Sequence, residues 1–214
     1  MPRVAAPTVR LLSASMKAGS AAEHAAAEGS PFVSALLAGQ VTAERYASYL
    51  LRLRVVYRAL EGAVRAHRND PVVAAVYDPA LERARAIDGD LEHWSTDGSR
   101  DVDSPAAVAI AERIEALPWS GSLVAHHYTR YLGDLSGGQA IGRGLNRAFA
   151  LGGVGLAFYR FPMRPKPYKD RYRARLDALN LDDAHADRIV EEVKLAFRLN
   201  RALLDELAGD APTQ

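Results

Sequence analysis

Proline directly after a serine or an aspartate is the feature of this sequence that most restricts its fold. The pair occurs four times, at Ser30-Pro31, Asp70-Pro71, Asp78-Pro79 and Ser104-Pro105. A serine or aspartate side chain caps the first backbone N–H groups of a helix, and proline suits the first helical position. Elsewhere apolar residues recur at three- and four-residue spacing, and no alternating run of strand length appears. The sequence therefore predicts an all-α protein.

Helices account for the predicted course of the chain, apart from one long loop and the two ends. In chain order we expect a loose arm at residues 1–7, a helix from Thr8 to about Glu28, a helix from Pro31 closed by Gly39, and a long helix after Thr42. Further helices follow Pro79 and Pro105, with Pro118 closing the second of these two, and a glycine-rich helix runs from Leu123. An ordered loop from Leu151 to Pro167 then leads to a basic helix from about Tyr168 to Leu179, a last helix from near Asp182, and a tail at residues 209–214. No internal repeat or linker divides the chain, so we expect a single domain over residues 1–214.

Composition excludes several classes of protein. A chain of 214 residues with 49% hydrophobic residues suits one globular domain and excludes wholesale disorder. The net charge of +1 gives no general attraction to nucleic acid or to an anionic membrane. The chain has no cysteine, so disulfides and zinc–thiolate sites are excluded. Neither a signal peptide nor a run of about 20 apolar residues is present, so we expect a cytoplasmic protein that does not enter a membrane.

Glycines weaken one of the predicted helices. Five of them lie between Gly133 and Gly144, although apolar residues keep the helical period there. Each glycine inside a helix costs about 1 kcal/mol relative to alanine, so their number needs a reason. Either a flat ligand lies against the backbone, or the helix bends. Asp134 lies within this run and Arg130 one turn before it, which by themselves indicate a surface ion pair.

The whole string from Tyr128 to Gln139, Tyr-Thr-Arg-Tyr-Leu-Gly-Asp-Leu-Ser-Gly-Gly-Gln, resembles the signature of the heme oxygenases. The resemblance implies an all-α fold in which heme lies between a proximal N-terminal helix and this kinked distal helix. It also implies that Gly133 and Gly137 let the backbone approach the macrocycle. Asp134 would then hold a water molecule at the face of heme where oxygen binds.

His24 is the candidate iron ligand among six histidines. The alanines around it form a smooth apolar surface on which a flat ring could lie, and Glu28, one turn later, could accept a hydrogen bond from the second ring nitrogen. A purely structural histidine is the alternative interpretation of these residues. The segment from Lys17 to Glu28 resembles the proximal helix of heme oxygenases, which implies that His24 binds the iron.

The segment from Arg160 to Arg175 contains seven basic residues and only one acidic residue. A solvated surface or a nucleic-acid patch is the alternative, and a single cluster on a nearly neutral chain speaks against nucleic acid. Lys169 and Arg173 are four residues apart, so both can point to one side of a helix and meet two carboxylates. The resemblance implies that these two hold the heme propionates, together with Lys17 and Tyr128. The remaining basic residues could bind an acidic electron donor.

Tyr57 and Asn200 are polar residues on otherwise apolar helical stripes. Buried polar groups need hydrogen-bond partners, and a satisfied pair in the core is the simpler interpretation. The resemblance instead joins them to Arg130, Asp134 and bound water in a network that delivers protons on the distal side.

Taken as a whole, the resemblance implies an enzyme that uses oxygen and external electrons to open heme to biliverdin, carbon monoxide and ferrous iron, for iron acquisition. Heme b would be both substrate and cofactor, and the biliverdin would be the IXα isomer. A ferredoxin or flavodoxin with its NAD(P)H reductase is the implied electron donor. Two alternatives remain open. One is a heme carrier or sensor without turnover, and the other is a non-heme member of the same fold, such as the thiaminase-like proteins, for which no motif matches.

Overall fold

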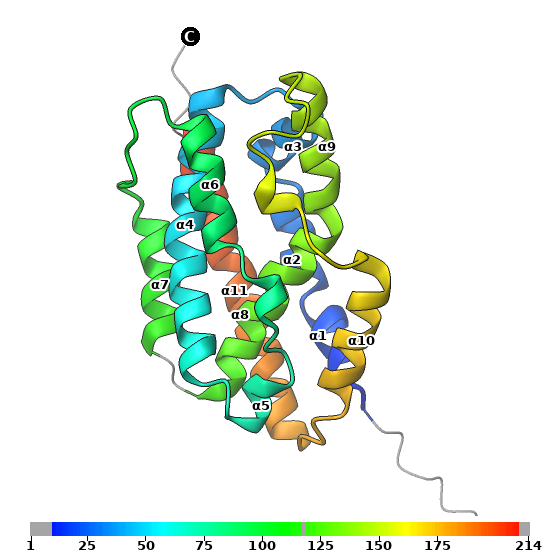
Figure 1. Cartoon of the computed structure of the whole chain (residues 1–214). Coiled ribbons are helices and arrows are strands. Elements are labelled where there is room, and N and C mark those ends of the chain that lie inside the picture. Colours follow the sequence, from blue (N-terminus) through cyan, green and yellow to red (C-terminus); the bar gives the residue numbers. More distant parts are fainter. Residues whose placement is uncertain (1–9, 117–118, 210–214) are drawn as a thin grey trace, which may run out of the picture.

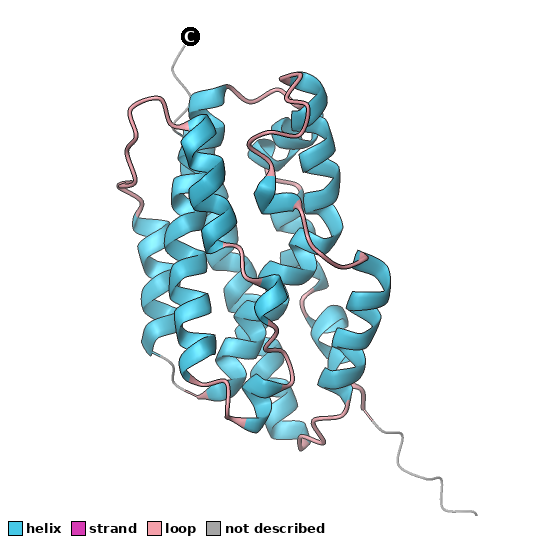
Figure 2. Cartoon of the chain, in the orientation of Figure 1, coloured by secondary structure: helices cyan, strands magenta, loops and turns pink. Residues whose placement is uncertain are grey.

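Helices make up nearly all of the structure outside its turns (Figure 2). The computed structural model describes residues 10–116 and 119–209, and no strand occurs within them. The α-helices are α1 (Leu12–Gly19), α2 (Ala21–Glu28), α3 (Pro31–Ala38), α4 (Ala43–Ala66), α5 (Pro71–Ala74), α6 (Ala84–Trp94), α7 (Pro105–Ala116), α8 (Ser120–Gly133), α9 (Gln139–Ala148), α10 (Pro165–Asp177) and α11 (Asp183–Gly209). The prediction of an all-α protein is confirmed.

The helices form two groups that the last helix joins. In Figure 1, α4, α6 and α7 stand side by side, while α1, α2, α3, α9 and α10 form the second group. α4 packs against α6 and α7, and α11 packs against α7 and α8 as well as α1, α2 and α3. The apolar stripe predicted for α4 is buried along its whole length, from Tyr46 to Val64. The apolar face of α4 is therefore part of the hydrophobic core.

Three of the four predicted capping side chains bond the start of a helix, whereas the prediction is wrong for Ser30, whose side chain makes no cap bond although α3 does begin at Pro31. The side chain of Asp70 accepts bonds from the Val72 and Val73 N–H groups, and Ser104 Oγ accepts from the Ala107 N–H. Asp78 instead caps a short 3₁₀ turn at Pro79–Leu81, and α6 begins only at Ala84. Because the Glu61 carboxylate of α4 accepts the N–H groups of Arg83 and Ala84, a tertiary contact determines where α6 starts.

The prediction of a single N-terminal helix is wrong, because the segment forms two helices, α1 and α2, with a break at Ser20. Ser20 has φ −106° and ψ 15°, and its Oγ donates to the Met16 carbonyl at 2.7 Å. A serine hydroxyl that bonds back to the preceding turn competes with the backbone and bends a helix. The proposed start at Thr8, the loose arm at residues 1–7 and the closing Pro118 lie outside the described residues.

Two boundaries near the other end also differ from the prediction. α10 begins at Pro165, earlier than the expected Tyr168, because proline fits the first turn of a helix. The preceding loop contains a 3₁₀ turn at Ala157–Tyr159. Gly209 is the last residue of α11 and not part of a tail, and residues 210–214 lie outside the described part of the chain.

The glycine-rich segment is a helix with a π-helical turn inside it. α8 runs into this turn at Asp134–Gly138, and α9 continues from Gln139. A π-helical turn widens the backbone and shifts the direction of a helix, and such turns are frequent at functional sites. The expected kink is therefore present, and its residues include Asp134.

Candidate functional site

A cavity of about 650 Å³ lies between α2 and the helix formed by α8, the π-helical turn and α9. Its size falls within the range of about 300–1,000 Å³ that is usual for pockets that enclose a small-molecule ligand. α11 contributes a wall through Phe197, Asn200 and Leu204. The two helices singled out in the sequence thus lie on opposite sides of one cavity.

On the proximal side, α2 presents its surface to the cavity and buries none of its residues. His24 lines the cavity, with its ring edge against Phe197 at 5.3 Å between centroids. Its Nδ1 lies 3.4 Å from the Glu28 carboxylate. This contact leaves Nε2 as the nitrogen that could bind a metal ion, and a carboxylate on Nδ1 is a common way to orient such a ligand.

On the distal side, the glycines serve two different purposes. A Cβ added at Gly133 or Gly137 would meet no protein atom within 4 Å, and both residues line the cavity. At Gly142 a Cβ would lie 3.0 Å from the Tyr159 ring, and at Gly144 it would lie 2.9 Å from the Leu37 carbonyl oxygen. The first two glycines keep the cavity open, whereas the other two allow close packing inside the protein.

Asp134 and its partners form a buried network beside the cavity. The Tyr57 hydroxyl donates to the Asp134 carboxylate, and Arg130 Nη1 donates to Asn200 Oδ1 at 2.7 Å. The Arg130 guanidinium also lies over the Tyr57 ring, 5.1 Å from its centroid. The simpler interpretation of Arg130 and Asp134 as a surface ion pair is therefore wrong, since Asp134 is buried and bonds Tyr57, whereas Arg130 bonds Asn200.

Burial controls the electrostatics of this network. It raises the pKa of Asp134 above the ordinary value, although the positive charge of Arg130 and the hydrogen bond from Tyr57 act against it. Burial also raises the pKa of Tyr57 well above its ordinary value, so the phenol keeps its proton and remains a donor. The carboxyl group can therefore exchange a proton closer to neutral pH than an exposed aspartate can.

Of the basic residues predicted to hold the propionates, two line the cavity and one does not. Lys17 of α1 and Arg173 of α10 line the cavity, as does Tyr128 of α8. Lys169 is not among the residues that line it: its Nζ donates to Ser136 Oγ of the π-helical turn at 2.7 Å. Burial lowers the pKa of Lys169, and the nearby Arg173 lowers it further.

Tyr49 is a lining residue that the sequence analysis missed. It lies two turns before Tyr57 on α4, is buried, and reaches the cavity. Burial raises its pKa, whereas the positive charge of Arg130, which lines the same cavity, lowers it. Its eight-residue spacing from Tyr57 is the signal in the sequence that could have identified it.

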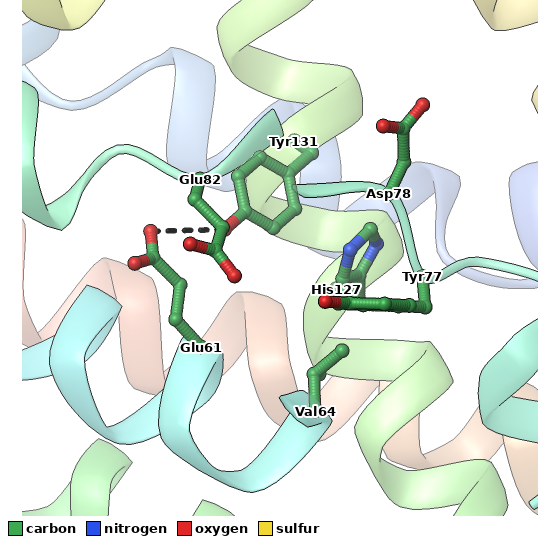
Figure 3. Close-up of a pocket in the computed structure, with 7 residues that line it drawn as sticks. All are labelled: Glu61, Val64, Tyr77, Asp78, Glu82, His127 and Tyr131. Carbon is green, nitrogen blue, oxygen red and sulfur yellow. Dashed lines mark hydrogen bonds between the residues drawn. The ribbon is translucent and has the colours of Figure 1, made fainter. Parts of the chain in front are cut away.

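A second, much smaller cavity is lined by polar groups that include Glu61, His127 and Tyr131 (Figure 3). Its volume of about 10 Å³ approaches the space of one water molecule. Tyr131 packs edge-on against Tyr57 and donates to the Glu61 carboxylate at 3.3 Å. His127 lines the same cavity, with Nδ1 2.9 Å from the Tyr172 hydroxyl, and burial lowers its pKa to about 3.

Residues 10–116 and 119–209 contain neither a cluster of metal-binding side chains nor a membrane-spanning helix. No three histidine, aspartate or glutamate side chains come together as a site for a metal ion. No helix in these ranges combines the length and the apolar character that crossing a membrane requires.

Comparison with known proteins identifies the family. Residues 10–206 match the family model described as heme oxygenase. The chain is 35% identical to heme oxygenase 2 of Synechocystis sp. over 206 residues, covering 92% of this chain and 82% of that protein. It is 36% identical to human heme oxygenase 1 over 206 residues, covering 92% of this chain and 71% of the human protein.

Solved structures agree with these matches. Heme oxygenase-1 from the cyanobacterium Synechocystis sp., crystallised in complex with heme, superposes with a TM-score of 0.88 at 33% identity and covers 94% of each chain. Heme oxygenase from Leptospira interrogans gives a TM-score of 0.86 at 32% identity, covering 92% of this chain and all of that one. The chain therefore belongs to the heme oxygenase family, and the resemblance of its glycine-rich helix is confirmed.

Proposed function

We propose that this enzyme binds heme in the 650 Å³ cavity and opens it to biliverdin IXα, carbon monoxide and ferrous iron. The observation that carries the proposal is the pairing of His24 with the open glycine wall on opposite sides of one cavity. Heme, when bound, supplies both the iron that activates oxygen and the ring that is oxidised. The protein's part is to hold the ring, keep one face open and manage protons there.

His24 would bind the iron through Nε2, with Glu28 holding the ring orientation from Nδ1. A single histidine suits a metal ion whose other ligands come from a macrocycle. The alanines of α2 that line the cavity, Ala21 and Ala27, leave room for a flat ring. The histidine, its carboxylate partner and the small side chains of α2 are therefore suited to one face of heme.

Arg173 and Lys17 would hold the two carboxylates of heme, with Tyr128 beside them. Lys169 lies one turn before Arg173 on the same helix, and we propose that it joins this group by exchanging Ser136 for a carboxylate. Cations at one edge determine how the ring is rotated in its plane. We therefore propose that one meso carbon is presented to the distal side and that the IXα isomer is the main product.

Asp134 would hold a water molecule on the open side of the ring and pass protons through it. A carboxyl group with a raised pKa suits this role, because efficient proton transfer needs a pKa near the working pH. Tyr57 restrains the carboxylate, and Asn200 restrains Arg130 behind it. The room to place the water comes from Gly133 and Gly137.

Electrons would come from an acidic protein in the cytoplasm, such as a ferredoxin or flavodoxin served by an NAD(P)H reductase. The support is a set of exposed basic residues close together in the sequence, Arg160, Arg164, Lys166 and Arg171. Complementary charge raises the rate of encounter between partners, and salt weakens it. Turnover with such a donor should therefore fall as ionic strength rises.

The test is to add hemin and a reductant in air, follow the Soret band, and separate the product by chromatography. Loss of the band with formation of biliverdin IXα supports the proposal, and the β or δ isomer would show that the heme is rotated. A carrier or sensor would retain the band unchanged. Asp134→Ala is the variant to compare with the wild type, since it changes the distal side and leaves His24 and the rest of α2 intact.

A further inference from the structure

The side chains of α2 pack less deeply than those of the helix before it. The preceding helix, α1, is anchored in the core by Leu12 and Met16, whereas α2 has no buried residue. α2 lies against α11 on one side and forms a wall of the cavity on the other. Polar contacts with α11 therefore contribute much to keeping α2, and with it His24, in position.

The C-terminal carbonyl groups of α2 show how this is done. The last carbonyls of a helix have no partner within it. The turn after α2 supplies N–H donors for Ala25 and Ala27, at 2.9 and 3.2 Å. The carbonyl between them, that of Ala26, accepts a bond from Arg201 Nη1 of α11 at 2.6 Å. Arg201 thus caps α2 from another helix.

A second arginine of α11 reaches the same helix. Arg198 Nη1 lies 3.5 Å from the Glu23 carboxylate, near the beginning of α2. Arg198 and Arg201 are three residues apart, so they lie on one face of α11. Between them Asn200 contributes to the cavity wall, as does Phe197 just before them. The arginine pair, Arg198 and Arg201, therefore contacts both ends of α2 from a helix that also contacts the ligand site.

We propose that the arginine pair positions α2 against α11 and thereby determines how tightly the cavity retains heme. This inference rests on the proposed function, because His24 is the residue that α2 presents. Substitution of either arginine would weaken heme retention by displacing α2 and not by removing a contact with heme, since neither arginine lines the cavity.

The two contacts should differ in strength. The Arg198 side chain is 56% exposed, and exposed ion pairs contribute little to stability. Arg201 places a cation at the C-terminal end of a helix and bonds a carbonyl there, which is favourable for both the charge and the orphan group. Asp205 holds the same guanidinium at 2.7 Å, so Arg201 is also restrained in its own helix. We expect Arg201 to dominate.

The first measurement uses the heme-free protein. Hydrogen–deuterium exchange should become faster in residues 21–30 of Arg201→Ala, with other regions unchanged. Arg201→Lys, which keeps the charge and one donor, should give an intermediate rate, and Glu23→Gln a smaller change. Arg58→Ala is the matched control, because Arg58 also pairs across two helices, with Asp88, but lies far from α2.

The second measurement is the rate at which bound hemin passes to excess apomyoglobin. Arg201→Ala should release hemin about tenfold faster than the wild type, and Arg58→Ala should not differ from it. Unchanged exchange in α2 together with unchanged hemin release would overturn the proposal, as would faster exchange throughout the chain. If the wild type binds no hemin, the proposed function fails, while the exchange measurement still decides whether the arginine pair holds α2.

Discussion

Two acidic residues at the cavity illustrate how surroundings assign roles to the same chemical group. The Glu28 side chain is 68% exposed and lies beside His24, where it can orient an imidazole. Asp134 is buried, receives a bond from Tyr57, and has a raised pKa. An exposed carboxylate beside an imidazole suits the proximal side, whereas a buried carboxyl with a raised pKa suits proton exchange on the distal side.

At this scale we predict that Asp134→Ala separates heme binding from turnover. The variant should bind hemin normally, because His24 lies on the opposite wall. Its formation of biliverdin should fall by about 100-fold or more, in line with the loss of an acid–base group. Asp134→Asn should keep more activity, since an amide can still hold a water molecule. Single-turnover formation of biliverdin at the wild-type rate in Asp134→Ala would contradict the role of this residue.

The second prediction at the residue scale concerns His24→Ala. Removal of the imidazole should abolish the axial ligand from the protein and leave Asp134 with its network unchanged. Added imidazole should then restore the absorption spectrum of the wild-type hemin complex. An unaltered spectrum without imidazole would assign the ligand to another histidine. His67→Ala, in an exposed residue at the end of α4, is a suitable control.

At the scale of elements, the glycines of the distal helix have opposite reasons to exist, so alanine should have opposite effects. Gly137→Ala should stabilise the heme-free protein by about 0.5–1 kcal/mol, because alanine favours the helix and its Cβ meets open space. The same Cβ would enter the cavity and weaken hemin binding. Gly144→Ala should be destabilising, since its Cβ would press on the Leu37 carbonyl. Thermal unfolding and hemin titration of both variants provide the check, and equal signs would refute this division.

At the scale of the whole molecule, buried His127 makes stability depend on pH. Its pKa in the folded protein is about 3, because burial disfavours the charged ring, whereas the ordinary value is 6.5. Between these values the unfolded chain binds a proton that the folded protein does not. Stability from this source is therefore complete above pH 6.5 and falls as the pH drops toward 3.

From pH 8 to pH 5 this group should cost about 2 kcal/mol of unfolding free energy, because the slope approaches 1.36 kcal/mol for each pH unit only below pH 6.5. Urea unfolding of His127→Gln should show a smaller loss over the same interval, since glutamine has no proton to gain. His185→Gln, at an exposed site, should follow the wild type. A loss in His127→Gln as large as that of the wild type would exclude His127 as the source.

The sequence by itself determined that the chain is helical, predicted most of the helices, and singled out most residues of the candidate site. Helical period and capping are local, because they depend on residues three or four apart, and they identified α3, α4, α7 and α11 closely. The glycine-rich string identified the family. Four residues that the sequence singled out, His24, Arg130, Asp134 and Asn200, line one cavity, and Tyr57 donates to Asp134, while the roles proposed for them stay predictions. These residues are recognisable because each departs from the pattern of its helix.

Only the tertiary structure decided the contacts between helices. The bond from Lys169 to Ser136 and the cap that Arg201 places on α2 join residues far apart in the sequence. Glu61 likewise sets the start of α6 from another helix. No local spacing encodes such contacts, because they depend on the angle and distance at which two helices pack. The sequence therefore supplies the chemical groups, and the packing of the helices decides which of them meet.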